Sequence, residues 1–261
     1  MTDSLAPLRA AIRRRGHERD SQRSGPTRTP PLPDGARDAP PRQFIRRGGA
    51  SDSRPDPHAG RIGPNAVIRL AEAAQAMLGP GAAAAVFEAA GLAHRLDAPP
   101  EAMVEEGEVV ALYAALATLA PEQAGAVSAE AGHLTADYLL AWRIPRPVQW
   151  LLRRLPPRLA ARILLGAIGG HAWTFAGSGR FSASAGAAAN VSVEGGPFAE
   201  PGAAREPLAA YYAAVFERLF RMLVSPAARA QAALDGSTCR IRLAWRREGA
   251  GRPLPKDAQP G

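Results

Sequence analysis

The stretch EPLAAYYAAVFERLFRMLV, residues 206–224, is the strongest helix signal in this chain of 261 residues. Its apolar residues recur at the 3.6-residue period of an amphipathic helix and form a wide stripe. A helix with such a stripe must bury it against another layer of the fold. The inward positions expected on this helix are Leu208, Tyr211, Tyr212, Val215, Phe216, Leu219, Phe220 and Leu223.

The sequence on both sides of this helix predicts β-structure. After it, Asp235-Gly236 stands between two alternating runs, which is a hairpin signal, and the inward positions of the second run are spaced by two. Before it, GRFSASAGAAANVSVEG, residues 179–195, indicates two short strands around a turn of small residues. The inward strand positions expected are Phe181, Val191, Val193, Cys239, Ile241, Leu243 and Trp245.

Helical periodicity dominates the chain before residue 179. Pro64 suits the first turn of a helix with Val67, Leu70, Ala74 and Met77 inward. The further helices predicted are 81–90, one after Pro99-Pro100 with Met103, Val110, Tyr113 and Leu116 inward, 122–142, 148–155 and 158–174. Helices come first, and a small antiparallel sheet packed with one long helix follows. The expected fold class is therefore α+β.

Composition divides the chain into four parts. Residues 1–60 hold 12 Arg against 7 acidic residues, and SGPTRTPPLPDGARDAPPRQ has prolines too dense for a helix or a strand. We expect a disordered Arg/Pro-rich leader at 1–60, a helical part at 61–145, a ligand-binding domain at 146–247 and a loose tail at 248–261.

Several classes of protein are excluded by composition. A single cysteine, Cys239, excludes a disulfide framework and an iron–sulfur cluster held by this chain alone. The net charge of +8 comes almost wholly from arginine in a chain rich in Ala, Gly and Pro, which indicates a GC-rich genome, so we expect no nucleic-acid partner. No secretory signal is visible and no apolar run reaches about 18 residues. We expect a cytoplasmic protein without a transmembrane segment, with peripheral attachment to the membrane as an alternative.

Six runs between residues 61 and 245 are distinctive when taken together and in order: RIGPNAVIRLAEA, LDAPPEAMV, TADYLLAWRIPRPVQWLLRRLP, HAWTFAGSGRF, YYAAVFERLFRMLVSP and CRIRL. Over nearly all of 61–245 they resemble the J-type 4-vinyl reductase of bacteriochlorophyll biosynthesis in purple bacteria. Residues 146–245 correspond to the 4-vinyl-reductase domain of that family.

This resemblance implies both a fold and a role. The domain is similar in fold to the ligand-binding domain of vesicle-tethering subunits, which implies a pocket for a hydrophobic small molecule. The family implies reduction of the 8-vinyl group (4-vinyl in the older nomenclature) of a divinyl chlorophyllide-type tetrapyrrole. That tetrapyrrole, other bacteriochlorophyll biosynthesis enzymes and a second copy of the chain are the implied partners.

The chain departs from the wider domain at several positions. Gly196-Pro197 stands where the domain has Asn-Pro, Ala210 precedes Tyr211, and Cys239 remains where the domain has further cysteines. A cysteine metal site, such as the one proposed for some relatives, is therefore not expected in this chain.

No redox cofactor motif accompanies the resemblance. Reduction of a vinyl group needs a hydride or two electrons plus protons, which a nicotinamide, a flavin or a cluster normally supplies. Gly177-Ser178-Gly179 follows a predicted helix and precedes a strand, the reverse of the dinucleotide fingerprint, and Ser182 occupies its third glycine position. If the chain is catalytic, it needs an external electron donor. Three interpretations stay open: a reductase or reductase component, a non-catalytic tetrapyrrole carrier or assembly factor, and a small-molecule sensor.

The candidate ligand-binding residues centre on HAWTFAGSGRF, residues 171–181. A neutral imidazole is a common metal ligand, aromatic rings stack on flat apolar surfaces, and arginine pairs with carboxylates. We expect His171 as axial ligand to the pigment Mg, Trp173, Phe175 and Phe181 against the macrocycle, Tyr211 and Tyr212 as proton donors, and Arg146 on a propionate. The alternative is structural: His171 bonds a carbonyl at a helix end, the aromatic residues fill the core, and Arg146 is solvated. The sequence assigns no catalytic residue and no metal held by protein side chains alone.

Overall fold

The computed structural model describes residues 60–245. The predicted leader, apart from Gly60, and the predicted tail lie outside this range. The division of the remainder at residue 145 stays a prediction.

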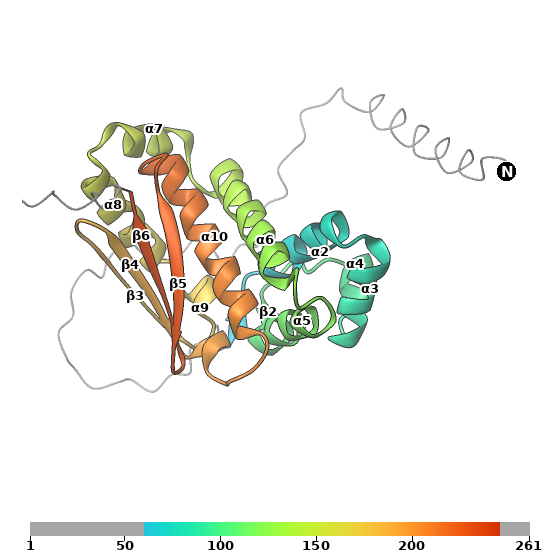
Figure 1. Ribbon diagram of the computed structural model, residues 1–261. Helices are drawn as coiled ribbons and strands as arrows, with labels where there is room; N and C mark the ends of the chain where they lie inside the picture. The colour runs from blue at the N-terminus through green and yellow to red at the C-terminus, as the bar shows by residue number, and fades with distance from the viewer. Residues whose placement is uncertain (1–59, 246–261) are drawn as a thin grey trace, which may run out of the picture. The chain divides into compact units, whose positions relative to one another are not determined.

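The predicted antiparallel sheet is present. Its strands are β3 (Arg180–Ala185), β4 (Ala189–Glu194), β5 (Arg229–Asp235) and β6 (Thr238–Ala244), in the order β3-β4-β6-β5. The long helix α10 (Arg205–Leu223) lies across one face of this sheet (Figure 1). The α+β class expected from the sequence is confirmed.

The face of the sheet toward α10 is apolar. Cys239, Ile241 and Leu243 of β6 are buried, and each pairs in register with a buried residue of β4, as alternation along a strand predicts. Burial raises the pKa of the Cys239 thiol to about 12, against an opposing effect of Arg205. Cys239 is therefore a small hydrophobe of the core at neutral pH.

The predicted hairpin is present, with its turn displaced by one position. Asp235 pairs with Thr238, so the two turn residues are Gly236 and Ser237 rather than the Asp-Gly pair. The guanidinium of Arg205 donates to the Gly236 carbonyl. This bond ties the turn to the first residue of α10.

A helical layer covers the face of α10 that points away from the sheet. In Figure 1, α6 lies beside α10, and α2 lies on the far side of α6. Pairing of β1 with β2 joins Ile62 to Val104 below this layer. The remaining elements are β1 (Arg61–Ile62), α2 (Asn65–Met77), α3 (Pro80–Ala89), α4 (His94–Asp97), β2 (Val104–Glu105), α5 (Glu106–Leu119), α6 (Ala124–Tyr138), α7 (Arg146–Arg154), α8 (Pro157–Gly169), α9 (Trp173–Ala176) and η3 (Gly196–Phe198).

Four expectations from the sequence need correction. Met103, expected on the helix after Pro99-Pro100, precedes β2, and α5 begins only at Glu106. Met77 ends α2 with 48% of its surface exposed, because the helix has run past the layer that its other apolar residues contact. The helix predicted over 122–142 is α6 followed by a π-helical turn, Leu139–Arg143, before Pro145. The helix predicted over 158–174 ends at Gly169, because chain reversal after it begins with the turn at Gly170.

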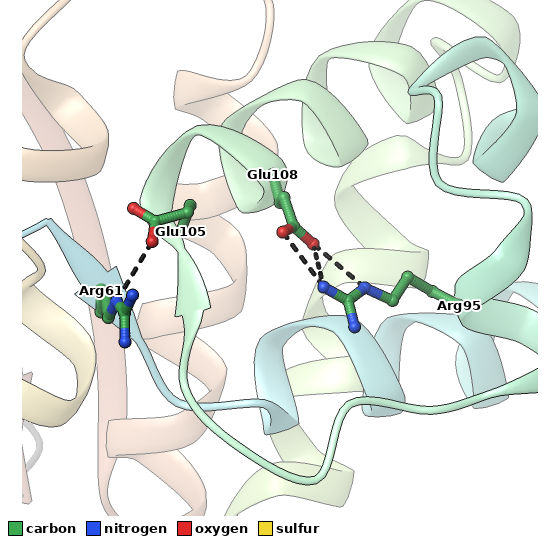
Figure 2. Close-up of polar contacts among 4 residues, drawn as sticks. All are labelled: Arg61, Arg95, Glu105 and Glu108. Atoms are coloured by element: carbon green, nitrogen blue, oxygen red, sulfur yellow. Dashed lines mark hydrogen bonds and ion pairs between the residues drawn. The ribbon is translucent and has the colours of Figure 1, made fainter.

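Two arginine–glutamate contacts join short elements near the start of α5 (Figure 2). Arg95 of α4 makes a two-pronged contact with Glu108, at 3.0–3.1 Å, and both side chains are about a quarter exposed. Arg61 of β1 contacts Glu105 of β2 at 3.1 Å in a much more exposed position. Partial burial makes the Arg95–Glu108 pair the more stabilising of the two.

The helices α6 and α10 approach each other most closely at Gly132. A Cβ atom at this position would meet the Tyr211 carbonyl, and it would lie 2.8 Å from the Cβ of Ala214. Only a residue without a side chain lets the two backbones pack at this distance.

We expect Gly132→Ala to destabilise the protein by about 1–3 kcal/mol, as overpacking of a core typically does. Gly125→Ala is the matched control on the same helix, since a Cβ there meets nothing within 4 Å. It should be neutral or slightly stabilising, because alanine favours helix. Chemical unfolding of both variants gives the comparison, and equal effects would contradict the packing assignment.

Candidate functional site

The histidine and aromatic residues of 171–181 occupy the connection between α8 and β3. His171 lies in the turn after α8, its amide donating to the Ile168 carbonyl at 2.9 Å. Trp173 and Phe175 belong to α9, a single helical turn. Phe181 is the second residue of β3. The sequence-based prediction therefore placed these residues near one another correctly, but it put His171 and Trp173 inside a helix that ends earlier.

The imidazole of His171 is exposed and oriented by the backbone. Its Nδ1 atom lies 3.1 Å from the Ala167 carbonyl oxygen. Because a carbonyl oxygen only accepts, this bond requires the proton on Nδ1. The neutral ring then presents the Nε2 lone pair, which is the form that binds a metal.

A group of seven rings lies beneath this turn, and we call it the aromatic cluster. Phe175 meets Phe181 edge to face at a centroid separation of 5.3 Å, and Phe181 is stacked parallel to Phe216 at 6.4 Å. Phe175 also contacts Tyr212 at 6.2 Å. These separations are those of interacting aromatic pairs. The cluster consists of Tyr113, Phe175, Phe181, Phe198, Tyr211, Tyr212 and Phe216.

The exposed fraction of these side chains decreases from the turn at His171 toward α10. Trp173 is 41% exposed, Phe175 and Phe181 are partly buried, and Tyr212 is 3% exposed. Four of the seven predicted ligand residues, Phe175, Phe181, Tyr211 and Tyr212, thus belong to one continuous series of ring contacts. His171 and Trp173 lie within four residues of Phe175 along the chain. Only the outer part of that series is open to a ligand without rearrangement.

The two tyrosine hydroxyls are bonded within the protein. Tyr212 donates to the Phe175 carbonyl, which holds α9 against α10. Thr135 donates to the Ala131 carbonyl at 2.9 Å, so in its 3.0 Å bond with Tyr211 the tyrosine is the donor. Burial raises the pKa of Tyr211 to about 12 and that of Tyr212 well above its usual value. Both hydroxyls are neutral donors already directed to protein oxygens.

Sequence reasoning did not identify Glu106 as part of this region. Its carboxylate accepts from the Ser178 amide at 2.7 Å and from the Ser178 hydroxyl at 2.8 Å. Gly177, at φ 60°, faces the same carboxylate so closely that a Cβ would overlap it. This contact explains Gly177 and Ser178, whereas a Cβ at Gly179 would meet the carbonyl oxygens of Ala176 and Glu194. No local pattern could reveal that Ser178 has a partner 72 residues away.

Arg146 takes part in a different region. It is exposed at the first residue of α7. Within 60–245, none of the ring contacts or hydrogen bonds of the aromatic cluster involves it. Its predicted pairing with a ligand carboxylate stays a prediction.

Two further features of the described chain bear on the kind of site. Among residues 60–245, no three His, Cys, Asp or Glu side chains gather closely enough to hold a metal ion. No helix in the same range combines the length and the apolar character that crossing a bilayer requires.

The fold and the site define an α+β protein in which an exposed histidine stands at the open edge of a buried aromatic cluster. The chain belongs to the family of the bacteriochlorophyll synthase 23 kDa chain. It is 43% identical over 166 residues to the Cereibacter sphaeroides protein of that name, covering 64% of this chain and 80% of the relative. Identity to the Rhodobacter capsulatus protein is 36% over 183 residues, covering 69% and 84%. No family model matches the chain.

Solved structures with partial likeness are H-NOX proteins. An Fe(II) unliganded H-NOX protein from K. algicida has a TM-score of 0.48 and 9% identity, over 73% of this chain and all of that one. A second H-NOX structure, from work on haem distortion in that family, has a TM-score of 0.47 and 11% identity, over 74% and 100%.

Removal of the Glu106 charge should loosen the turn that carries the site. We expect Glu106→Gln to lower the free energy of unfolding by about 1–2 kcal/mol, because two hydrogen bonds to a carboxylate are weakened. Hydrogen exchange at the Ser178 amide should rise with it. Glu105→Gln, which removes an exposed contact, serves as the control and should change stability by less than about 0.5 kcal/mol. Equal effects of the two substitutions would contradict the anchoring role.

Alkaline pH should destabilise the protein through its buried tyrosines. Unfolded tyrosines lose their protons near pH 10, whereas burial raises the pKa of Tyr211 to about 12. The unfolded state then binds fewer protons, so stability is retained below about pH 10 and falls as the pH rises toward 12. Urea unfolding at several pH values checks this, and Tyr211→Phe should lessen the loss. A native tyrosinate absorbance that rises fully near pH 10 would contradict it.

Proposed function

We propose that this protein acts in bacteriochlorophyll biosynthesis by binding a chlorophyllide-type tetrapyrrole at the 8-vinyl (4-vinyl) reduction step. Membership of the family of the bacteriochlorophyll synthase 23 kDa chain supports the pathway. The resemblance of the sequence to 4-vinyl reductases supports the step. The exposed, oriented imidazole of His171 beside the aromatic cluster is the observation that carries the proposal.

His171 is proposed as the axial ligand to the Mg²⁺ of the pigment. Its Nδ1 proton is committed to the Ala167 carbonyl, so Nε2 remains the nitrogen with a lone pair. The same bond limits rotation of the ring, which lowers the entropy lost when a ligand binds. The exposed position of the ring lets a large planar pigment approach.

Trp173, Phe175 and Phe181 are proposed to contact the macrocycle. They follow His171 within ten residues and come from α9 and β3, so one flat ligand could meet the histidine and the outer rings together. Large apolar faces gain most from such aromatic contact. Arg146 is proposed to pair with the propionate, which places the ligand's polar edge toward α7.

The structure favours a carrier as a second candidate beside a reductase. Reduction of the vinyl group to ethyl adds two electrons and two protons, so a hydride donor such as NADPH and a proton source are required. Tyr211 and Tyr212, proposed as proton donors, already donate to Thr135 and Phe175 within the core. A step that used these protons would have to break a buried hydrogen bond, which costs about 1–3 kcal/mol. Binding is the role common to both candidates.

Binding is tested by absorbance titration of the full chain with divinyl chlorophyllide. A saturable shift of the Soret band is expected for the wild type, with affinity at least about tenfold weaker in His171→Ala. His94→Ala, which removes an exposed histidine of α4, is the control and should bind as the wild type does. Equal affinity of all three proteins would remove His171 from the site.

Catalysis is tested separately on the saturated complex. NADPH is added under nitrogen and the pigment is then analysed for the ethyl product. Conversion by this chain alone establishes the reductase, whereas binding without conversion favours the carrier.

A further inference from the structure

The surface of α7, α8 and the turn before them carries both exposed large hydrophobic side chains and many arginines, which rarely occur together on a water-exposed face. Of the ten large hydrophobic side chains exposed within 60–245, six lie in 142–163. The same segment holds six arginines, and from 138 to 193 the sequence contains no Asp or Glu. We call this surface the basic-apolar face: Trp142, Val148, Trp150, Leu151, Leu159 and Ile163, with Arg154, Arg158 and Arg162.

The inner side of α7 is fixed against the rest of the protein. Leu152 is buried, and the Gln149 amide donates to the carbonyls of Leu140 at 2.6 Å and Ile144 at 2.8 Å. Arg153 donates to the Met222 carbonyl at 3.0 Å and so joins α7 to the end of α10. These contacts leave α7 no freedom to turn its other side inward.

The outer side of α7 is therefore held toward solvent. Trp150 and Leu151 lie between the buried residues Gln149 and Leu152 along the chain. Because successive residues of an α-helix are about 100° apart around its axis, both side chains face away from the core. They are 58% and 48% exposed. The Arg154 guanidinium lies 4.8 Å from the centroid of the Trp150 ring. An arginine stacked on an outward tryptophan presents charge and apolar area at the same spot.

The helix α8, like α7, has a buried inner side and an exposed outer side. Its inner side buries Ala160, Leu164 and Leu165, and the helix packs on β3. Leu159 and Ile163, one turn apart, are each 44% exposed on the other side. Arg158 and Arg162 flank them. The helices α7 and α8 contact each other and follow one another along the chain (Figure 1). Their exposed residues therefore lie on neighbouring parts of the surface.

We propose that the basic-apolar face docks this protein on the surface of an anionic lipid bilayer. Arginine pairs with lipid phosphate, and tryptophan, leucine and isoleucine gain by entering the boundary between headgroups and acyl chains. Helices α7 and α8, of 9 and 13 residues, are too short to span the bilayer and lie in its plane. A nucleic acid would satisfy the arginines but leave the apolar side chains in water, whereas lipid satisfies both.

The proposal does not depend on pigment binding and is tested without pigment. The full chain is sedimented with vesicles of mixed phosphatidylglycerol and phosphatidylcholine, and with vesicles of phosphatidylcholine alone. We expect binding to the anionic vesicles, at least about tenfold weaker binding to the neutral ones, and weakening by salt. Equal binding to both vesicle types would overturn the proposal.

Double substitutions on and off the basic-apolar face test whether vesicle binding depends on this face. Trp150→Ala with Leu151→Ala should weaken vesicle binding at least about tenfold. Met77→Ala with Leu119→Ala is the matched control, because those side chains are 48% and 50% exposed elsewhere. It should leave vesicle binding unchanged.

Charge is tested in the same way. Arg158→Gln with Arg162→Gln should weaken binding, while Arg221→Gln with Arg240→Gln should not. Retained binding in both sets of face variants would place the lipid contact elsewhere on the chain and overturn the proposal. If the wild type does not bind vesicles, the proposal is overturned. If the wild type also self-associates and Trp150→Ala dissociates it, the face is a protein interface instead.

Discussion

The close approach of α6 and α10 at Gly132 is the contact on which the rest of the arrangement depends. It lets α10 sit between the sheet and the helical layer, so that apolar side chains around most of this helix are buried. Next to this contact, the Tyr211 hydroxyl donates a hydrogen bond to Thr135. One residue further along α10, the Tyr212 hydroxyl donates to the Phe175 carbonyl. The position of α9 therefore follows from the spacing between α6 and α10.

The region around His171 consequently has a rigid inner part and an open outer part. Glu106 and Tyr212 fix the backbone of 175–178 from two sides, and the aromatic cluster fills the space beneath. His171 and Trp173 extend from this support toward solvent. Rigid placement of exposed groups is what a site needs in order to bind a large flat molecule without ordering itself first. The same rigidity ties up the tyrosine hydroxyls, which is why binding is better supported than proton transfer.

Much of the fold could be predicted from local patterns. The stripe of 206–224, the alternation of β6 and the turn after Asp235 depend on neighbours in sequence, and all three are present. What could not be predicted depends on distant partners. The contact of Glu106 with Ser178 joins residues 72 positions apart, and the early end of α8 reflects how the chain must reverse to reach β3. The exposure of Met77 likewise depends on where the neighbouring layer stops, which periodicity does not reveal.

The grouping of His171 with the outer aromatic residues was foreseeable because they are adjacent in sequence. The most direct test of the account is nitrogen NMR of the His171 imidazole during saturation with divinyl chlorophyllide. The account predicts that the Nε2 resonance shifts on ligation while Nδ1 keeps its proton and its bond to Ala167. Saturable binding of the pigment with both His171 nitrogens unchanged would contradict it.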